Sequence, residues 1–188
     1  MPQNKIIIIS GPGGVGKTTT STYLCEKFPN RFRESVSCTT RPIRKGEINH
    51  VHYHFLSDQE FQEKIESGEF VEFNKFPNGY MYGTLFSEIS DTLKSKNCIM
   101  IIDPKTAMFL KQTQFFEANK TITIFLDYEE EVIMERLKNR GASLEEIWQR
   151  VEIAREERKF AKDFDFIVQA RDLYSQSKEI CQIAGENC

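Results

Sequence analysis

The sequence predicts an α/β fold in which helices cover both faces of a parallel sheet. Short apolar runs that are typical of buried strands alternate with segments of helical length and pattern. The chain has 188 residues, of which 39% are hydrophobic, so it is long enough for one compact domain with its own core. The longest apolar runs, residues 6–9 and 98–102, are too short to span a bilayer, and we expect no membrane partner.

The elements follow one another as strand–helix pairs. Residues 5–10 form a β-branched run that ends at a glycine, and a helical segment follows and stops near Pro29. The same alternation returns later in the chain. The predicted strands are 5–10, 98–103, 121–126 and 164–168, and the predicted helices are 18–27, 106–118, 129–139 and 172–184. Ser143 and Glu146 have capping-box spacing, so we expect another helix to begin there.

Residues 35–95 interrupt this alternation. They are rich in Thr, Phe, Tyr, Gly and His, and only 58–67 have a helical pattern. Residues 70–76 and 80–84 flank Pro77-Asn78-Gly79, which predicts a hairpin. We therefore interpret residues 1–188 as a single domain. Its core comprises 1–34, 96–127 and 151–188, a small β-rich insertion comprises 35–95, and a helical excursion comprises 128–150.

Charge and cysteine content narrow the function classes. The net charge is −3, from 25 basic and 28 acidic residues, whereas a dedicated nucleic-acid binder is usually clearly basic. We therefore expect no nucleic-acid partner. The five cysteines are odd in number and scattered, which favours reduced thiols in a cytoplasmic protein over a disulfide framework. The sequence identifies no protein partner.

A phosphate-binding motif follows the first predicted strand. Residues 11–18 read Gly-Pro-Gly-Gly-Val-Gly-Lys-Thr and fit G-x-x-x-x-G-K-[ST], the P-loop. Its glycines allow backbone N–H groups to approach phosphate oxygens, and the following helix directs its positive end at them. Lys17 would place a charge near the β- and γ-phosphates, and the Thr18 hydroxyl would reach Mg²⁺ directly or through water. The motif predicts a P-loop NTPase-type sheet that binds a nucleoside triphosphate with Mg²⁺.

A second cluster of polar residues covers 35–47. Arg41 and Arg44 are close in sequence and would converge on one phosphate, and Tyr53 and Tyr82 would add hydroxyl donors. The alternative is a basic surface turn beside two ordinary core tyrosines. The residues by themselves leave both interpretations open.

Six motifs together resemble those of guanylate kinases. The family's G-P-S-G-x-G-K-[ST] is present with Gly13 in the serine position, and S-x-S-x-T-T-R-x-x-R-x-G-E is intact over 35–47. Its Y-Y-G-[ST] is present with Met81 in place of the first tyrosine. The remaining motifs are Y-x-F at 53–55, G-E-F-x-E at 68–72 and R-L-x-x-R-G at 136–141. The resemblance extends from Lys5 to about Leu173.

This resemblance implies in-line transfer of the γ-phosphoryl group of ATP to GMP, and to dGMP, with Mg²⁺. It makes 35–95 the NMP-binding insertion and 128–150 the lid. The ATP-binding residues it implies are Gly11, Gly13, Gly14, Val15, Gly16, Lys17, Thr18 and Thr19. The GMP-binding residues are Ser37, Arg41, Arg44, Tyr53, Glu72, Tyr82, Thr84 and Asp103. The catalytic residues are Lys17, Arg41, Arg136, Arg140 and Arg150, and Thr18 is the metal-binding residue.

The chemistry of guanine supports the role that the resemblance gives to Glu72. Guanine presents N1–H and its 2-amino group as adjacent donors, and one carboxylate can accept from both. Adenine presents an acceptor at N1, so it would meet the carboxylate unfavourably. The alternative for Glu72 is a solvated strand residue.

The chain also departs from the family pattern. The family's D-x-D-x-Q-G appears with Ile101 in place of the first aspartate, and N-D-x-L appears as residues 170–173, Ala-Arg-Asp-Leu. Two alternatives therefore stay open: a catalytically impaired guanylate-kinase-like binding module, and a related kinase with another phosphorylated acceptor. Lys17 and Thr18 argue against the first, and Glu72 argues against the second. His50, His52 and His54 alternate on a predicted strand, but we do not expect them to bind metal.

Overall fold

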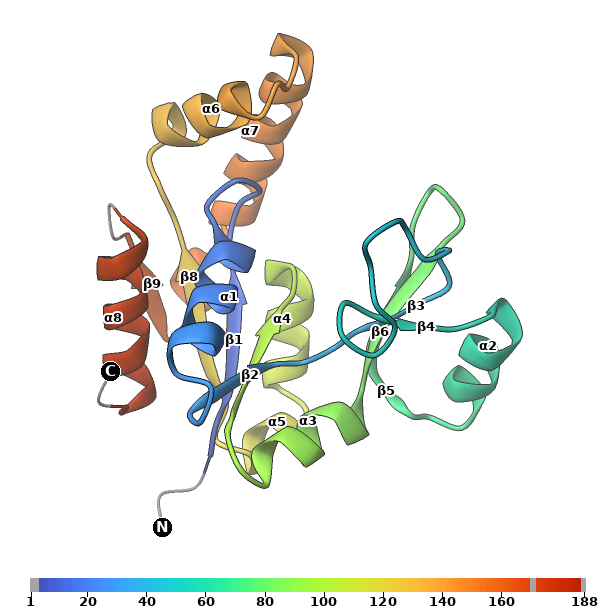
Figure 1. Ribbon diagram of the computed structural model, residues 1–188. Coiled ribbons are helices and arrows are strands. Elements are labelled where there is room, and N and C mark those ends of the chain that lie inside the picture. The colour runs from blue at the N-terminus through green and yellow to red at the C-terminus, as the bar shows by residue number, and fades with distance from the viewer. Residues whose placement is uncertain (1–3, 170–171, 187–188) are drawn as a thin grey trace.

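The computed structural model describes residues 4–169 and 172–186, and its centre is a five-stranded parallel sheet (Figure 1). The strand order is β2-β7-β1-β8-β9, and every neighbouring pair is parallel. The strands are β1 (Ile6–Ser10), β2 (Phe32–Glu34), β7 (Asn97–Ile101), β8 (Ile122–Leu126) and β9 (Phe166–Val168). The predicted parallel α/β architecture is confirmed. Strand β2 was not predicted, because three residues are too few to show a periodic pattern.

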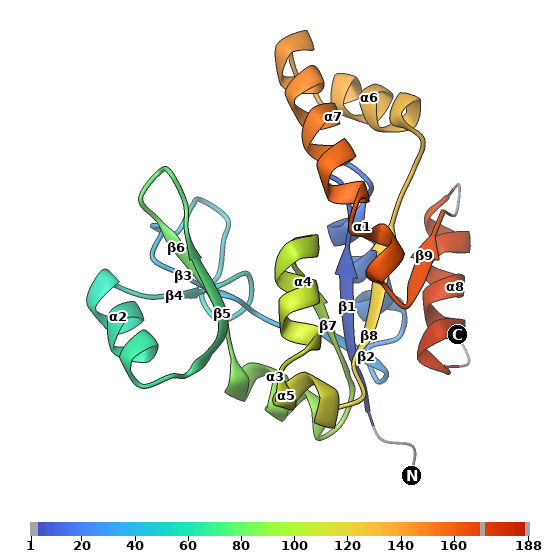
Figure 2. The ribbon, with the colours of Figure 1, turned by 180° about the vertical axis from the view of Figure 1, so that it is seen from behind.

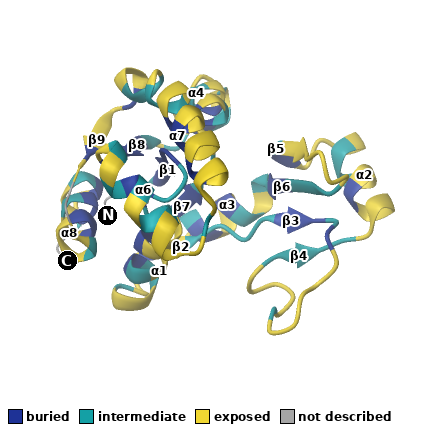
Figure 3. Cartoon of the chain, turned by 90° about the horizontal axis from the view of Figure 1, so that it is seen from above, coloured by how far each residue is buried: buried dark blue, intermediate teal, exposed yellow. Residues whose placement is uncertain are grey.

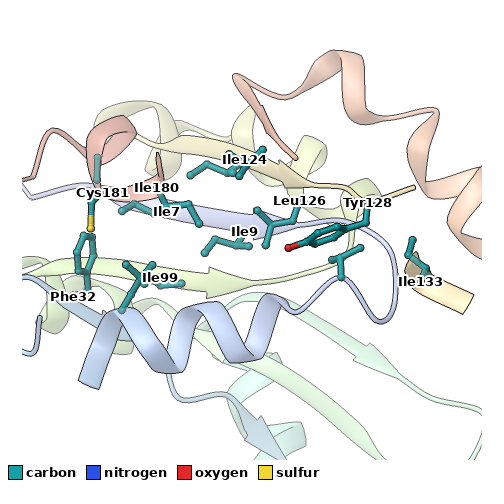
Figure 4. Close-up of a cluster of buried hydrophobic side chains, with 14 residues drawn as sticks. Ile7, Ile9, Phe32, Ile99, Ile124, Leu126, Tyr128, Ile133, Ile180 and Cys181 are labelled. Atoms are coloured by element: carbon teal, nitrogen blue, oxygen red, sulfur yellow. The ribbon is translucent and has the colours of Figure 1, made fainter. Parts of the chain in front are cut away.

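The side chains of β1 alternate between the two faces of the sheet. Ile7 and Ile9 pack against α1 (Lys17–Lys27) and α8 (Leu173–Ala184), a cluster shown in Figure 4. Ile6 and Ile8 face α3 (Phe86–Leu93) and α4 (Pro104–Lys111). All four isoleucines are fully buried, and burial of one such side chain contributes about 1.5–3 kcal/mol. This two-sided burial explains why β1 is a continuous apolar run and not an alternating one.

The sequence-based helix assignments need two corrections. The predicted helix 106–118 is two helices, α4 and α5 (Gln114–Ala118), because the chain turns at Thr113, whose Oγ1 donates to the Leu110 carbonyl at 2.8 Å. The turn brings Leu110 and Phe116 into the same buried cluster. Helix α3 was not predicted, although its Ile89 is buried against the sheet.

Residues 38–85 form a second, mixed sheet beside the first (Figure 3). Its order is β4-β3-β6-β5, and α2 (Asp58–Glu66) packs on it through the fully buried Phe61. The strands are β3 (Cys38–Thr39), β4 (His54–Phe55), β5 (Phe70–Lys75) and β6 (Met81–Leu85). The predicted β5–β6 hairpin is confirmed as an antiparallel pair. The strand expected through the three histidines is wrong: His50 is in a turn with φ 65°, and only His54 belongs to β4.

Two helices rise beyond the carboxyl ends of the main strands (Figure 2). They are α6 (Glu130–Asn139) and α7 (Leu144–Arg158), and the predicted capping box begins α7 with Glu146 N–H donating to Ser143 Oγ at 3.2 Å. Because α7 continues without a break past residue 150, the boundary that we expected between lid and core lies inside one helix.

The sequence led us to expect reduced cysteines and no membrane-spanning segment. Cys25, Cys38 and Cys98 are free, as expected, whereas Cys181 is disulfide-bonded, against the expectation of thiols throughout. Within residues 4–169 and 172–186, every helix is too short or too polar to cross a bilayer.

Candidate active site

The candidate site lies where the parallel strands end. Strands β1, β7 and β8 are neighbours, so their carboxyl ends meet at one edge of the sheet. The phosphate loop follows β1, Asp103 follows β7, and Tyr128 follows β8. The fold therefore places residues that are more than 100 positions apart in the chain around one opening.

The phosphate loop runs closely over the end of β8. Gly11 has φ 130°, and a Cβ on it would lie 2.0 Å from the Leu126 carbonyl oxygen, so only glycine fits. Gly16 is the N-cap of α1 with φ 95°, and it has no side chain to occupy the helix N-terminus. The exposed Thr18 and Thr19 lie in the first turn of α1. Free N–H groups at this helix start form a site for an anion.

Lys17 folds back over the loop. Its Nζ donates to the carbonyl oxygens of Gly11 and Pro12, the latter at 3.1 Å. Burial lowers the pKa of Lys17, and the nearby Glu157 carboxylate opposes that shift. The amine is thus desolvated and tethered to backbone oxygens at the point where the motif expects phosphate.

The three arginines predicted for the lid lie around the loop. Arg136 Nη1 donates to the Val15 carbonyl at 3.2 Å, and its guanidinium stacks 4.1 Å from the centre of the Tyr128 ring. The Arg150 side chain comes within 3.9 Å of a Cβ built on Gly13. Arg140 lines a cavity of about 320 Å³ that it shares with Gly14 and Gly16. The structure brings these predicted arginines together on one side of the loop.

A second polar group lies on the inserted sheet. Thr84 Oγ1 donates to Glu72 Oε1 at 2.8 Å and lies 3.4 Å from Ser37 Oγ. Burial raises the pKa of Glu72, and Asp103 adds to the rise. Three predicted base-reading residues are therefore adjacent, on strands β5 and β6 and just before β3. Glu72 and Ser37 line a cavity of about 450 Å³, which Tyr53, Tyr82 and Asp103 also line.

Arg41, Tyr53 and Tyr82 form a second cluster on the inserted segment, near Glu72 and Ser37. The Arg41 side chain is 7% exposed and makes a two-point ion pair with Glu47. Its guanidinium lies 5.5 Å from the Tyr53 ring, whose centre is 5.9 Å from that of Tyr82. Arg44 has an exposed side chain, and its backbone N–H donates to Glu47 Oε2 at 2.7 Å. The structure thus brings Arg41, Tyr53 and Tyr82 together, with the Arg44 backbone bonded to the same Glu47 carboxylate.

Asp103 has a structural task as well as a place in the cavity. Its Oδ1 accepts from Thr106 N–H at 3.0 Å and caps α4, with Pro104 at the first helical position. The cap fixes the carboxylate between the phosphate loop and the inserted sheet.

Sequence reasoning missed three residues of this site. Glu47 orients Arg41, Tyr128 supports Arg136, and Glu157 faces Lys17 from α7. Glu47 is part of the matched signature, so it had a signal that we did not use. Tyr128 and Glu157 had none, because their partners are distant in the chain. Two departures from the family pattern, Ala170 and Arg171, lie outside the described residues.

A parallel sheet with a glycine-rich loop after its central strand, and a lysine folded over that loop, defines a protein of the P-loop NTPase type. The family model described as guanylate kinase matches residues 3–185. The guanylate kinase of Chlorobium chlorochromatii is 39% identical over 173 residues, 89% of this chain and 87% of that protein. The guanylate kinase of Helicobacter pylori is 37% identical over 178 residues, 93% of this chain and 83% of that protein. This chain belongs to the guanylate kinase family.

The fold agrees with that of a solved structure from the same family. The crystal structure of guanylate kinase from Anaplasma phagocytophilum aligns with a TM-score of 0.70 at 24% identity. The alignment covers 97% of this chain and 85% of that one. This likeness supports the arrangement of sheet, insertion and helical excursion.

Proposed function

We propose that this protein transfers the γ-phosphoryl group of ATP to GMP, and to dGMP, as the family assignment implies. One observation carries the proposal: Glu72, which accepts a hydrogen bond from Thr84, and Ser37 line one cavity together with Tyr53 and Tyr82, and Arg41 lies beside the Tyr53 ring. This arrangement matches an acceptor with a donor-rich base at one end and a phosphate at the other.

On the acceptor side, the Glu72 carboxylate accepts from guanine N1–H and the 2-amino group. Thr84 holds that carboxylate in place, and Ser37 provides a further hydroxyl for the base edge. Arg41, Arg44, Tyr53 and Tyr82 bind the acceptor phosphate. Asp103, fixed as the cap of α4, closes the cavity toward the phosphate loop.

On the donor side, the backbone of 11–16 together with Thr18 and Thr19 holds the triphosphate. Lys17 leaves its carbonyl partners and pairs with the β- and γ-phosphates. Arg136, Arg140 and Arg150 meet the charge that spreads over the transferring group. Catalysis is then positioning and charge neutralisation, with no covalent intermediate on the protein.

The residues present fit Mg²⁺. The Thr18 hydroxyl is exposed in the first turn of α1, and Glu157 Oε2 is a buried carboxylate oxygen without a hydrogen-bond partner in the described structure. Hard oxygen ligands of this kind are what Mg²⁺ prefers, and it usually keeps several waters. Thr18 would hold the ion directly or through water, and Glu157 and Asp103 would face its hydration shell. When bound, Mg²⁺ neutralises charge on the β- and γ-phosphates.

We also propose a cytoplasmic location, which the free thiols of Cys25, Cys38 and Cys98 favour and the disulfide of Cys181 does not. The proposed function favours an active enzyme over an impaired binding module, because Lys17 and the loop are complete.

The test is ADP formation from Mg-ATP with GMP, dGMP, AMP, CMP, UMP or no acceptor, measured side by side. We expect turnover with GMP and dGMP only. Turnover with all nucleotides or with none, at enzyme concentrations that bind GMP, would overturn the proposal.

A further inference from the structure

Gln176 is a buried amide with one unused end. It lies on α8, beside α1 (Figure 1), with 2% of its surface exposed. Its Oε1 accepts from Thr20 Oγ1 at 2.6 Å, whereas its Nε2 is buried and has no hydrogen-bond partner among the described residues. The Thr20 hydroxyl can donate or accept, so whichever way the amide is turned, one end is paired and the other is not.

A buried polar group without a partner is unfavourable and rare in folded proteins. A ligand atom that fills the vacant position would remove that penalty. Gln176 lines the same cavity of about 320 Å³ as Gly14, Thr19, Arg136 and Leu173. Gln176 therefore forms part of the wall of a cavity that begins at the phosphate loop.

The position of this cavity indicates which part of a ligand enters it. It shares no lining residue with the cavity that holds Glu72 and Tyr82. A triphosphate bound along the loop has its nucleoside at one end and its reacting γ-phosphate at the other. Because the γ-phosphate must face the acceptor, the donor nucleoside belongs in the cavity that Gln176 lines.

We propose that the Gln176 side-chain amide hydrogen-bonds the nucleoside of the phosphate donor and positions it over the loop. An amide N–H can donate to a ring nitrogen of adenine or to a ribose oxygen. Thr20 fixes the amide in orientation, so the contact is prepared before the donor binds. This inference rests on the proposed function for the identity of the donor.

Two isosteric variants test the contact. Gln176→Met keeps the volume and removes both polar ends, and Gln176→Glu still accepts from Thr20 but cannot donate. Calorimetric titration with ADP in the absence of acceptor should show affinity lowered about 3- to 10-fold in the Met variant, as expected for one net hydrogen bond. The apparent KM for ATP should rise in parallel, and that for GMP should stay unchanged.

Inorganic tripolyphosphate is the probe that separates a nucleoside contact from a disturbed loop. It binds the loop without a nucleoside, so its affinity should be equal in the wild type and in Gln176→Met; the charge added by Gln176→Glu would repel it, so that variant is not compared with this probe. Ser177→Ala is the matched control, because Ser177 is equally buried on the same helix and does not line the cavity. It should leave ADP affinity unchanged. Thermal midpoints of all variants establish that the fold is intact.

The outcomes are distinct. ADP affinity unchanged by Gln176→Met, or tripolyphosphate weakened as much as ADP, would overturn the inference. If 2′-deoxy-ADP loses affinity in the variant as ADP does, the contact is to the base or to the remaining ribose oxygens; if it does not, the contact is to the 2′-hydroxyl. A protein that binds ADP through Gln176 but fails to phosphorylate GMP would refute the proposed function and leave this inference standing.

Discussion

Glu47 holds Arg41 at two points: Arg41 Nη2 donates to Glu47 Oε1 at 2.7 Å, and Nη1 donates to Oε2 at 3.0 Å. A carboxylate opposite a guanidinium in this fork geometry fixes the plane of the guanidinium. These hydrogen bonds lower the pKa of Glu47 to about 2. Arg41 is therefore oriented toward the tyrosine pair before any acceptor phosphate arrives.

Replacement of Glu47 by Gln should weaken acceptor binding. The amide oxygen of the variant would still accept one hydrogen bond from the Arg41 guanidinium, but the second would be lost. We therefore expect the KM for GMP to rise about 3- to 10-fold, as for one net hydrogen bond. Because the Glu47 carboxyl stays ionised down to about pH 2, the effect should be equal at pH 6 and pH 8. Steady-state kinetics at both pH values measure it.

Glu66→Gln is the control for charge alone, because Glu66 is exposed at the end of α2, away from the cavity. It should leave the KM for GMP unchanged. A lower KM in Glu47→Gln would mean that Glu47 competes with the phosphate for Arg41 and does not position it.

Lys17→Ala should abolish transfer while sparing acceptor binding. The Lys17 amine is the charged side chain of the phosphate loop and would pair with the donor phosphates. Removal of one electrostatic contact of this kind lowers kcat about 100- to 1000-fold. GMP affinity should change little, because Glu72 is on the second sheet and Arg41 follows its strand β3, both away from the phosphate loop. Single-turnover rates and GMP titration measure the two quantities. Lys27→Ala, at the exposed far end of the same helix, should behave as wild type.

Glu72→Gln should reduce the preference for guanine. An amide oxygen can accept one of the two donors of guanine, but the amide NH₂ meets the other donor. We expect the ratio of kcat/KM for GMP to that for AMP to fall about 10- to 100-fold, the range for hydrogen bonds to a charged group. An unchanged ratio would remove Glu72 from base recognition. Glu69→Gln, on the exposed side of the same segment, is the control.

The pH dependence of GMP binding should follow Glu72. Burial raises its pKa above the ordinary value of 4.5, so the carboxylate takes up a proton at a higher pH than a free glutamate does. Protonation removes its capacity to accept from two donors. As pH falls toward this raised pKa, the KM for GMP should rise more steeply in the wild type than in Glu72→Gln. The phosphate of GMP titrates equally in both proteins, so parallel profiles would contradict the assignment.

The sequence predicted those strands and helices whose apolar residues either form a continuous run or recur at a regular spacing. The isoleucines of β1 are buried on both faces, so their run has no other reasonable interpretation. Strands β3 and β4 have two residues each and are set by the pairing of β3 with β6 and of β4 with β3, which no local pattern records. The chain turns between α4 and α5 at Thr113, whose Oγ1 donates to the Leu110 carbonyl, a contact that periodicity does not record.

The same distinction applies to the site. Lys17 and Arg41 belong to motifs whose spacing carries the chemistry, and in the structure Lys17 contacts the loop carbonyls and Arg41 lies beside Tyr53. No motif in the sequence marks Gln176 as a site residue. Its hydrogen-bond partner Thr20 lies 156 positions away, and many other residue types could occupy a buried position of α8. Contacts between distant elements require the fold.

Gly11→Ala should destabilise the protein and destroy the loop. The added Cβ would lie 2.0 Å from the backbone oxygen of Leu126, which cannot move without disturbing β8, and φ 130° is strained for alanine. Gly13→Ala is the matched control, since the nearest atoms to its Cβ belong to the Arg150 side chain at 3.9 Å. We expect a lower thermal midpoint and no ADP binding in Gly11→Ala, and a wild-type midpoint in Gly13→Ala. Equal midpoints would show that the loop adapts.

Trp148 should report movement of α7 when nucleotide binds. It is the only tryptophan of the chain and is 55% exposed; Leu144, one turn earlier, is 73% exposed. Arg150 lies on the same helix and its side chain approaches the phosphate loop at Gly13. If phosphates draw Arg150 inward, α7 moves with it and this apolar face is covered. We expect ADP with GMP to shift the Trp148 emission to shorter wavelength, and Arg150→Ala to require more ADP for the same shift. Emission that is unchanged at saturating nucleotide would mean that α7 is already in its bound position.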